Sequence, residues 1–377
     1  MLVIDDHGKI IDLIDPAENK NIPGDVEKLK GLLCPGFVNT HCHLELSWTK
    51  NKITEKTGLG EFVINLQNAK QTANKDEIVE AIVQADLEMQ KNGIVAVGDI
   101  SNTDYSFGTK ATSSIYYHTF IEVYASMPWM AEEKFNRAET IWDKLTGELK
   151  LNGSITPHAT YSVSKPLFEL IKKHAETHSS ILSIHHQEAM DETLFFLNKT
   201  GWIIESMKKL GIDYSWFQAT GKPPLESVAG FLPEASPLLL VHNTFTVENE
   251  IGFALSNFKN LFWCLCPNAN LYIENRLPDI PLLRKKSCKL TIGTDSLASN
   301  HQLSVLTELK TISQAFPEIS LAELLQWATL NGAQFLGVDD RFGSFEKGKT
   351  PGINLISDID VNHPVLTSNA NVLPYSL

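Results

Sequence analysis

Four segments of the chain carry histidines and carboxylates in arrangements that can bind a metal ion. In an extended strand the side chains alternate between two faces, so His41 and His43 point the same way and Cys42 points the opposite way. Three neutral imidazoles with one carboxylate are a normal ligand set for Zn²⁺, and less often for Fe²⁺. The segments are His41-Cys42-His43, His185-His186-Gln187-Glu188, His242 and Asp295.

Each segment taken alone also has a structural explanation. A buried histidine can be satisfied by the backbone, and an aspartate after a strand can cap the next helix. Because His185 and His186 are adjacent, one of them must face outward, and alternation alone does not say which. The metal interpretation depends on all four segments occurring in strand order.

Eight short apolar runs, each followed by a helical segment, predict the framework that carries these groups. Apolar strands alternating with helices are typical of a parallel sheet covered by helices. Eight units favour a closed (β/α)₈ TIM barrel, in which active sites lie at the carboxyl ends of the strands. The predicted strands are 36–43, 94–100, 115–123, 154–158, 181–185, 238–242, 261–266 and 289–294.

Capping signals mark the helices between these strands. Asn74, three residues before Glu77, resembles a capping box, and Gly93 stands where a helix would end. Ser164 precedes a helix with Pro166 in its first turn. The longest connection, about 190–236, is predicted to hold a helix pair over the active-site mouth.

The two ends of the chain differ from the repeating pattern in the middle. Residues 1–34 and 343–377 contain short β-like runs, and we expect them to pair into a small β-sandwich-like domain. Residues 35–342 would then form the catalytic barrel. Because the chain begins close to the barrel, either the small domain is reduced or Met1 is not the natural start.

Several motifs resemble those of the amidohydrolase superfamily, in its branch of aminopurine deaminases and chlorohydrolases. Residues 35–43 (PGFVNTHCH) are similar to the PGFIN-x-HxH motif of the first strand, and residues 157–164 (PHATYSVS) to PHAPYTVS. His185-x-x-Glu188 matches HxxE, and His242 matches the sixth-strand histidine. Residues 266–270 (CPNAN) and 293–300 (GTDSLASN) resemble CPxSN and GTDSLASN.

The resemblance extends over residues 31–356 in the expected order. The HxHLELS form at 41–47 and the Lys349-x-Pro351-Gly352 ending are most like aminodeoxyfutalosine-deaminase-type proteins. The usual Gly-Lys-x-Ala-Asp-Leu near the carboxyl terminus is replaced here by residues 348–353 (GKTPGI), outside the expected active site.

The resemblance also implies a role for each site residue. The implied metal ligands are His41, His43, His185 and Asp295. Glu188 would shuttle protons with Asp295 as a second acceptor, His242 would lie beside the bound water, and His158 would contact the substrate. Since His158 stands where dinuclear relatives carry a bridging lysine, one divalent metal is implied, with zinc preferred and iron the alternative.

Two further charged residues lie on predicted active-site loops. Glu45 follows the HxH motif, and Arg276 follows the CPNAN segment. Each is either a substrate contact or an exposed loop charge. We include both among the substrate-binding candidates.

The composition limits the classes of partner. The 377 residues are 43% hydrophobic and 20% charged, as in a folded protein, and the net charge of −13 would be repelled by nucleic acid or an anionic membrane. Five cysteines without a CxxC pair and an amino terminus without a leader pattern indicate a cytoplasmic protein. We expect a small-molecule substrate, and a homodimer is the assembly considered.

These observations together predict a metal-dependent hydrolase acting on carbon–nitrogen bonds other than peptide bonds. The expected reaction is hydrolytic deamination of an aminopurine nucleoside-type substrate, aminodeoxyfutalosine-like, which releases ammonia through a metal-activated water. One alternative is an amide, imide or chloro-triazine hydrolase that uses the same water. Another is a catalytically inactive scaffold, which the complete ligand set argues against.

Overall fold

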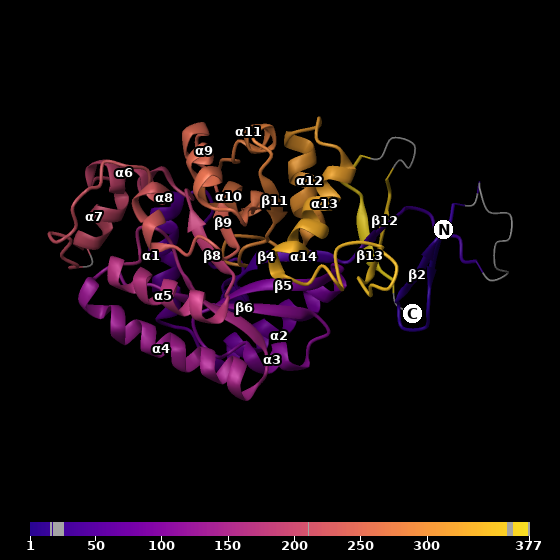
Figure 1. Ribbon diagram of the computed structural model, residues 1–377, viewed down its shortest axis with the longest axis horizontal. Coiled ribbons are helices and arrows are strands. Elements are labelled where there is room, and N and C mark those ends of the chain that lie inside the picture. The colour runs from indigo at the N-terminus through magenta and orange to yellow at the C-terminus, as the bar shows by residue number, and fades with distance from the viewer. Residues whose placement is uncertain (16, 18–25, 210, 360–364, 376–377) are drawn as a thin grey trace.

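Eight parallel strands form a barrel at the centre of the computed structural model, which describes residues 1–15, 17, 26–209, 211–359 and 365–375 (Figure 1). All eight predicted strands are present, each within two residues of its expected bounds. The barrel strands are β4 (Phe37–Cys42), β5 (Ile94–Ser101), β6 (Tyr116–Val123), β7 (Asn152–Pro157), β8 (Leu182–His186), β9 (Leu238–His242), β10 (Leu261–Leu265) and β11 (Lys289–Ile292).

The barrel consists of two four-stranded halves, β4 to β7 and β8 to β11, that meet along two seams. At one seam the backbone N–H of His185 donates to the carbonyl of His158 over 2.9 Å. At the other, the backbone N–H groups of Thr294 and Asp295 donate to the carbonyl of His41, each over 3.0 Å. Residues predicted to do chemistry therefore also close the barrel.

Helices surround the barrel and connect its strands (Figure 1). Four short helical turns, η1 to η4, lie in the loops at Leu44–Thr49, Pro128–Met130, Lys144–Glu148 and Ala229–Phe231. The α-helices are α1 (Gly58–Lys70), α2 (Lys75–Lys91), α3 (Phe107–Thr112), α4 (Ala131–Asp143), α5 (Lys165–His178), α6 (Met190–Asn198), α7 (Trp202–Lys209), α8 (Pro224–Val228), α9 (Glu248–Asn257), α10 (Pro267–Glu274), α11 (Ile280–Lys285), α12 (Val305–Ala315), α13 (Leu321–Ala328) and α14 (Leu330–Leu336).

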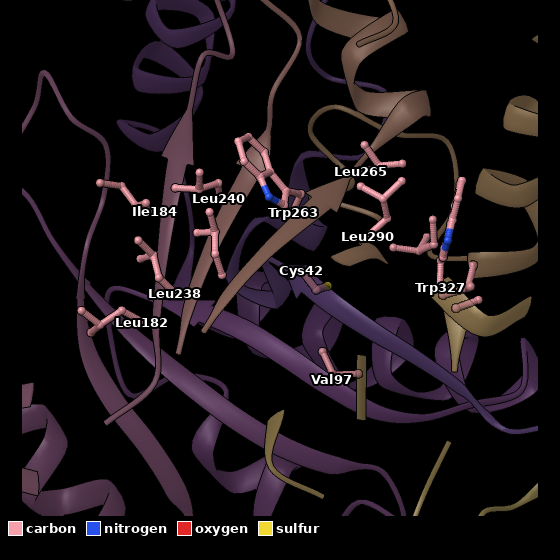
Figure 2. Close-up of a cluster of buried hydrophobic side chains, with 14 of the residues drawn as sticks. Cys42, Val97, Leu182, Ile184, Leu238, Leu240, Trp263, Leu265, Leu290 and Trp327 are labelled. Carbon is pink, nitrogen blue, oxygen red and sulfur yellow. The ribbon is translucent and has the colours of Figure 1, made fainter. Parts of the chain in front are cut away.

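The strands contribute alternate residues to two separate hydrophobic clusters. One cluster lies between the barrel and the helices and includes the outward-facing side chains of β8 to β11 (Figure 2). The other fills the barrel interior with residues of the opposite phase, such as Leu239, Val241 and Phe262. This is the pattern expected of strands that are buried on both faces.

Helix α14 packs into the interior cluster from the amino ends of the strands. The ring of Phe335 stacks 6.0 Å from Phe120 and lies 5.5 Å from Phe262, measured between centroids. Asn331 of the same helix donates to the carbonyl of Leu290 over 2.8 Å. The site is therefore confined to the opposite, carboxyl end.

The chain ends form small sheets beside the barrel (Figure 1). Strand β12 (Ile353–Ser357) pairs antiparallel with both β3 (Leu32–Pro35) and β13 (Asn371–Pro374). The hairpin of β1 (Leu2–Ile4) and β2 (Ile10–Leu13) joins residues 348–349 through Ile10. The two ends therefore associate as expected, whereas the domain boundaries at 34 and 343 stay a prediction.

Among the described residues, no helix is both long and apolar enough to cross a membrane.

Two local expectations about helices need correction. The side chain of Asn74 caps α2 by accepting from the N–H of Asp76, so a simple cap replaces the expected capping box with Glu77. The 190–236 connection contains the expected pair, α6 and α7, together with a third helix, α8. The predicted end of α2 at Gly93 and the predicted start of α5 after Ser164 are found as expected.

Phe335 tests the closure of the barrel by α14. We expect Phe335→Ala to lower the free energy of unfolding by about 3–5 kcal/mol, because it leaves a cavity in a filled interior. Leu255→Ala on α9, whose side chain is 41% exposed, serves as the control. Urea unfolding measures both, and equal losses in the two variants would contradict the closing role of α14.

Candidate active site

Four predicted ligand side chains converge at the carboxyl end of the barrel. Nε2 of His43 lies 3.1 Å from Nε2 of His41 and 3.4 Å from Nε2 of His185. Oδ1 of Asp295 lies 3.4 Å from Nε2 of both His41 and His43. Strands β4 and β8 thus bring nitrogens of His41, His43 and His185 within 4.8 Å of one another, and Asp295, after β11, forms a second such group with His41 and His242.

The chemistry of this donor set fits a bound cation. Nδ1 of His185 lies 2.8 Å from the carbonyl oxygen of His158 and can only donate to it, so Nε2 of His185 presents a lone pair to the cluster. Burial, followed by the charges of neighbouring histidines, lowers the pKa of His41 and His43 well below the usual range. Neutral imidazoles that face one another with lone pairs repel unless a cation lies between them.

Asp295 is held as a carboxylate by its surroundings. Burial acts to raise its pKa, but His43, His242 and a hydrogen bond from the Ser299 hydroxyl outweigh burial and lower it. Its backbone has φ of 55°, a left-handed conformation that is uncommon for residues other than glycine. Gln187 (49°) and His242 (76°) share this feature at the ends of β8 and β9. Such strained positions cluster at functional sites.

Gly293 permits the approach of β11 to the neighbouring strands. A Cβ at this position would lie 2.7 Å from Sγ of Cys264, 2.8 Å from Cβ of His41 and 2.9 Å from Sγ of Cys266. Since these contacts are shorter than carbon and sulfur atoms tolerate, only glycine fits here. The first residue of the GTDSLASN segment thus allows the chain after β11 to pass close to His41, Cys264 and Cys266.

Glu188 and His242 form the second part of the cluster. Oε1 of Glu188 lies 3.6 Å from Nε2 of His242, and the rings of His242 and His185 stack with centroids 5.6 Å apart. Burial and the nearby Asp295 raise the pKa of Glu188 well above its usual range. A carboxyl group with a raised pKa can hold and release a proton near neutral pH.

Two buried glutamates fix the loops that carry these groups. Glu192 accepts hydrogen bonds from the backbone N–H of Gln187 (3.1 Å) and Glu188 (2.8 Å). Glu308 accepts from Nδ2 of both Asn268 (2.9 Å) and Asn300 (2.7 Å), which joins the CPNAN and GTDSLASN segments. Sequence reasoning did not select either glutamate, because each lies on a helix and acts through other residues.

His186 and His158 occupy different positions around the cluster. The ring of His186 faces Trp263 of the outer layer, and its Nδ1 lies 3.0 Å from Oδ1 of Asn243. His158 lies beside His185, with ring centroids 4.8 Å apart, and its Nδ1 contacts the Ser162 hydroxyl over 2.7 Å. The structure therefore brings His185 to the cluster and turns His186 away.

A cavity of about 320 Å³ opens beside His43. Glu45 lines it and accepts hydrogen bonds from the backbone N–H of Asn102 (3.0 Å) and the hydroxyl of Thr103 (2.8 Å). Burial raises the pKa of Glu45 to about 7. Arg276 is exposed over the ring of Phe245, 4.7 Å from its centroid, and does not line this cavity.

Glu122 is a site residue that the sequence reasoning missed. It lies near the end of β6 and lines the cavity, and its Oε1 is 3.5 Å from Nδ1 of His185. Oε2 accepts from Nδ2 of Asn102 over 3.1 Å, whereas Oε1 is buried without a hydrogen-bond partner. A carboxylate near the carboxyl end of a predicted strand, where barrel active sites lie, was the signal that could have identified it.

Comparison with known proteins gives one family and one fold. Residues 32–374 match the amidohydrolase family. The chain is 26% identical over 369 residues to an adenosine deaminase of Helicobacter pylori, covering 94% of this chain and 87% of that protein. The crystal structure of Helicobacter pylori aminofutalosine deaminase in complex with methylthio-coformycin superposes with a TM-score of 0.82 at 23% identity, over 99% of this chain and 92% of that one. An adenosine deaminase from Xanthomonas campestris with bound zinc gives 0.71 at 22% identity, over 93% and 78%.

The two adjacent histidines provide a matched test of the metal centre. We expect His185→Ala to lose bound metal, because its Nε2 faces the cluster, and His186→Ala to keep it, because that ring bonds to Asn243. Elemental analysis of the purified variants measures the metal per chain. Loss in His186→Ala with full retention in His185→Ala would contradict this assignment, and two metals per wild-type chain would contradict a single-metal site.

Proposed function

This chain belongs to the amidohydrolase family, and from that premise we propose that it is a metal-dependent deaminase of adenosine-type nucleosides. The observation that carries the proposal is a buried carboxyl with a raised pKa, Glu188, which lies 3.6 Å from His242 and beside Asp295 of the candidate metal site. Expulsion of an amine from a ring requires a proton donor next to the attacking water. The deaminase names of its relatives support the same reaction.

We infer that His41, His43, His185 and Asp295 hold one divalent cation, zinc in preference to iron. The zinc bound by a protein of the same fold supports this choice. Such a cation supplies Lewis acidity, which lowers the pKa of water toward about 7. Asp295, kept ionised by its histidine neighbours and Ser299, accepts a proton or a hydrogen bond from the attacking water.

Glu188 then carries protons between water and substrate. Water adds to the amine-bearing ring carbon, and its proton passes through Glu188 to the adjacent ring nitrogen. The proton of the newly added hydroxyl then passes to the amine, the carbon–nitrogen bond breaks, and ammonia leaves while the ring carbon keeps the oxygen as a carbonyl. His242, within 3.6 Å of Glu188, orients the attacking oxygen, while Glu192 keeps Glu188 in place through its backbone.

The remaining substrate contacts follow from the cavity beside His43. We propose that His158, which lies beside His185, contacts the ring, and that the cavity lined by Glu45 and Glu122 holds the rest of the nucleoside. Arg276 requires a movement of its loop to contribute, since it rests on Phe245.

The five cysteines are all free and buried, which supports the proposed cytoplasmic location.

The first test concerns Glu188. We expect Glu188→Gln to keep its metal and to lower kcat by roughly 10²-fold or more, because the amide keeps the size of the side chain and loses its proton transfer. Glu176→Gln, an exposed change on α5, serves as the control. Steady-state kinetics measure both variants. A rise in KM with kcat nearly unchanged would make Glu188 a binding residue.

The second test is the reaction itself. We expect the metal-loaded protein to release one ammonia per turnover from an adenosine-type nucleoside, with aminodeoxyfutalosine tried first in a panel. The conversion is followed by its ultraviolet shift together with an ammonia assay. A protein that is inert toward the whole panel, yet cleaves a cyclic amide or dechlorinates a triazine, would contradict deamination.

A further inference from the structure

A buried ion pair lies behind the turn that follows the HxH motif, and it takes no part in the proposed reaction. Asp99, on β5, and Lys110, on α3, have side chains with no exposed surface, and Nζ of Lys110 lies 2.6 Å from Oδ2 of Asp99. Nζ of Lys110 also donates to the hydroxyls of Ser101 and Thr119, each over 3.0 Å. The three donors of the ammonium group are therefore all satisfied within the protein.

The stability of the fold does not by itself explain this ion pair. Removing two charges from water is costly, and apolar residues of similar volume often replace such a pair without loss of stability. Buried ionic groups are better attested as devices that fix one arrangement of the chain. The second oxygen of Asp99 shows which arrangement is fixed here, because Oδ1 accepts a hydrogen bond from the backbone N–H of Leu44 over 2.8 Å.

Leu44 directly follows His43, whose position depends on this turn. His41 lies within β4, and its carbonyl accepts from two backbone N–H groups at a barrel seam. His43 lies beyond the end of β4 and immediately before η1, and its carbonyl accepts from the N–H of Leu46 over 3.1 Å. The barrel strands therefore position the first histidine, whereas the turn that is bonded to Asp99 positions the second.

His43 in turn occupies the centre of the candidate metal site. Its Nε2 lies within 3.4 Å of Nε2 of both His41 and His185 and of Oδ1 of Asp295. A displacement of His43 would therefore change its distance to every other expected ligand. In the part of the chain that the structure describes, the groups that could hold a metal ion include neither member of the ion pair. The pair therefore acts on the site through the backbone of the turn.

We propose that Asp99 and Lys110 are positioning residues, which hold His43 at the metal site through the backbone N–H of Leu44 and thereby strengthen metal binding. This inference rests on the metal site of the proposed function and not on deamination. Lys110 fixes the orientation of the Asp99 carboxylate, and Asp99 bonds to the turn. Groups that support metal ligands indirectly typically change metal affinity by about 10- to 100-fold when they are removed.

Two double variants separate the hydrogen bond from the charges. Asp99→Leu/Lys110→Met removes both charges and the acceptor for Leu44, whereas Asp99→Asn/Lys110→Met removes the charges and keeps an amide oxygen as an acceptor. Competition with a chromophoric zinc chelator measures the dissociation constant for zinc. We expect the first variant to bind zinc about 10- to 100-fold more weakly than the wild type, and the second to stay within about threefold of it.

Phe335→Ala controls for a general loss of stability, because it weakens the opposite end of the barrel. It should lower stability to urea in the metal-free protein and leave the dissociation constant for zinc within about threefold of the wild-type value. Equal dissociation constants for the wild type and Asp99→Leu/Lys110→Met would overturn the proposal. Equal weakening by the two double variants would also overturn it, because the hydrogen bond to Leu44 would then not matter.

The wild type provides a second measurement if the double variants do not fold. Coupling between two sites is reciprocal, so a turn that strengthens metal binding is itself strengthened by the metal. Zinc should therefore slow hydrogen exchange at least about tenfold in a peptide that covers residues 44–49, and less in a peptide that covers α5. Unchanged exchange at residues 44–49, or equal slowing in the two peptides, would overturn the proposal.

A failure of the proposed function gives a different result. If the protein binds zinc but deaminates no nucleoside, the deaminase assignment is wrong, and the zinc affinities still decide this inference. If it binds no zinc, the metal site itself is wrong, and hydrogen exchange of residues 44–49 in the double variants decides whether Asp99 holds the turn. Faster exchange in Asp99→Leu/Lys110→Met than in Asp99→Asn/Lys110→Met supports the positioning role, and equal exchange overturns it.

Discussion

The closure of the barrel and the assembly of the histidine cluster depend on the same few backbone hydrogen bonds. His41 accepts from Thr294 and Asp295 at one seam, and His158 accepts from His185 at the other. Each bond joins two strands and also fixes the position of a residue in the cluster. Because the halves meet only sparsely at these seams, cohesion between ligand groups through a cation would also strengthen the barrel.

Buried polar groups are concentrated around the cluster, and several of them hold its loops in place through hydrogen bonds and an ion pair. Asp99 forms a buried ion pair with Lys110 over 2.6 Å and accepts from the backbone N–H of Leu44 over 2.8 Å, which fixes the turn after the HxH motif. Glu192 fixes the loop after β8 through its hydrogen bond from the backbone of Glu188, and Glu308 fixes the loop after β11 through its hydrogen bond from Asn300. Such networks are costly if left incomplete, so these supporting residues are as constrained as the ligands.

Most of the fold and the core of the site could be predicted from the sequence, since both depend on local patterns. Apolar runs identified the eight strands, and alternation placed Cys42 in the outer layer, away from the cluster. The choice of His185 over His186 came from the family resemblance, because alternation alone allowed either. Glu122 was missed although it lies near the carboxyl end of a predicted strand. The position of Arg276 could not be predicted, since it depends on how its loop packs against Phe245. The assigned chemical roles stay predictions.

The aromatic packing of α14 against Phe120 and Phe262 affects how substrate enters the barrel and how products leave it. With the amino end of the barrel filled, the carboxyl end must serve as both entrance and exit in the described structure. A small leaving molecule and a larger ring product would then share one opening with the next substrate. Departure of the larger product therefore has to precede each new arrival, so the mobility of the loops around that opening can set the pace of turnover.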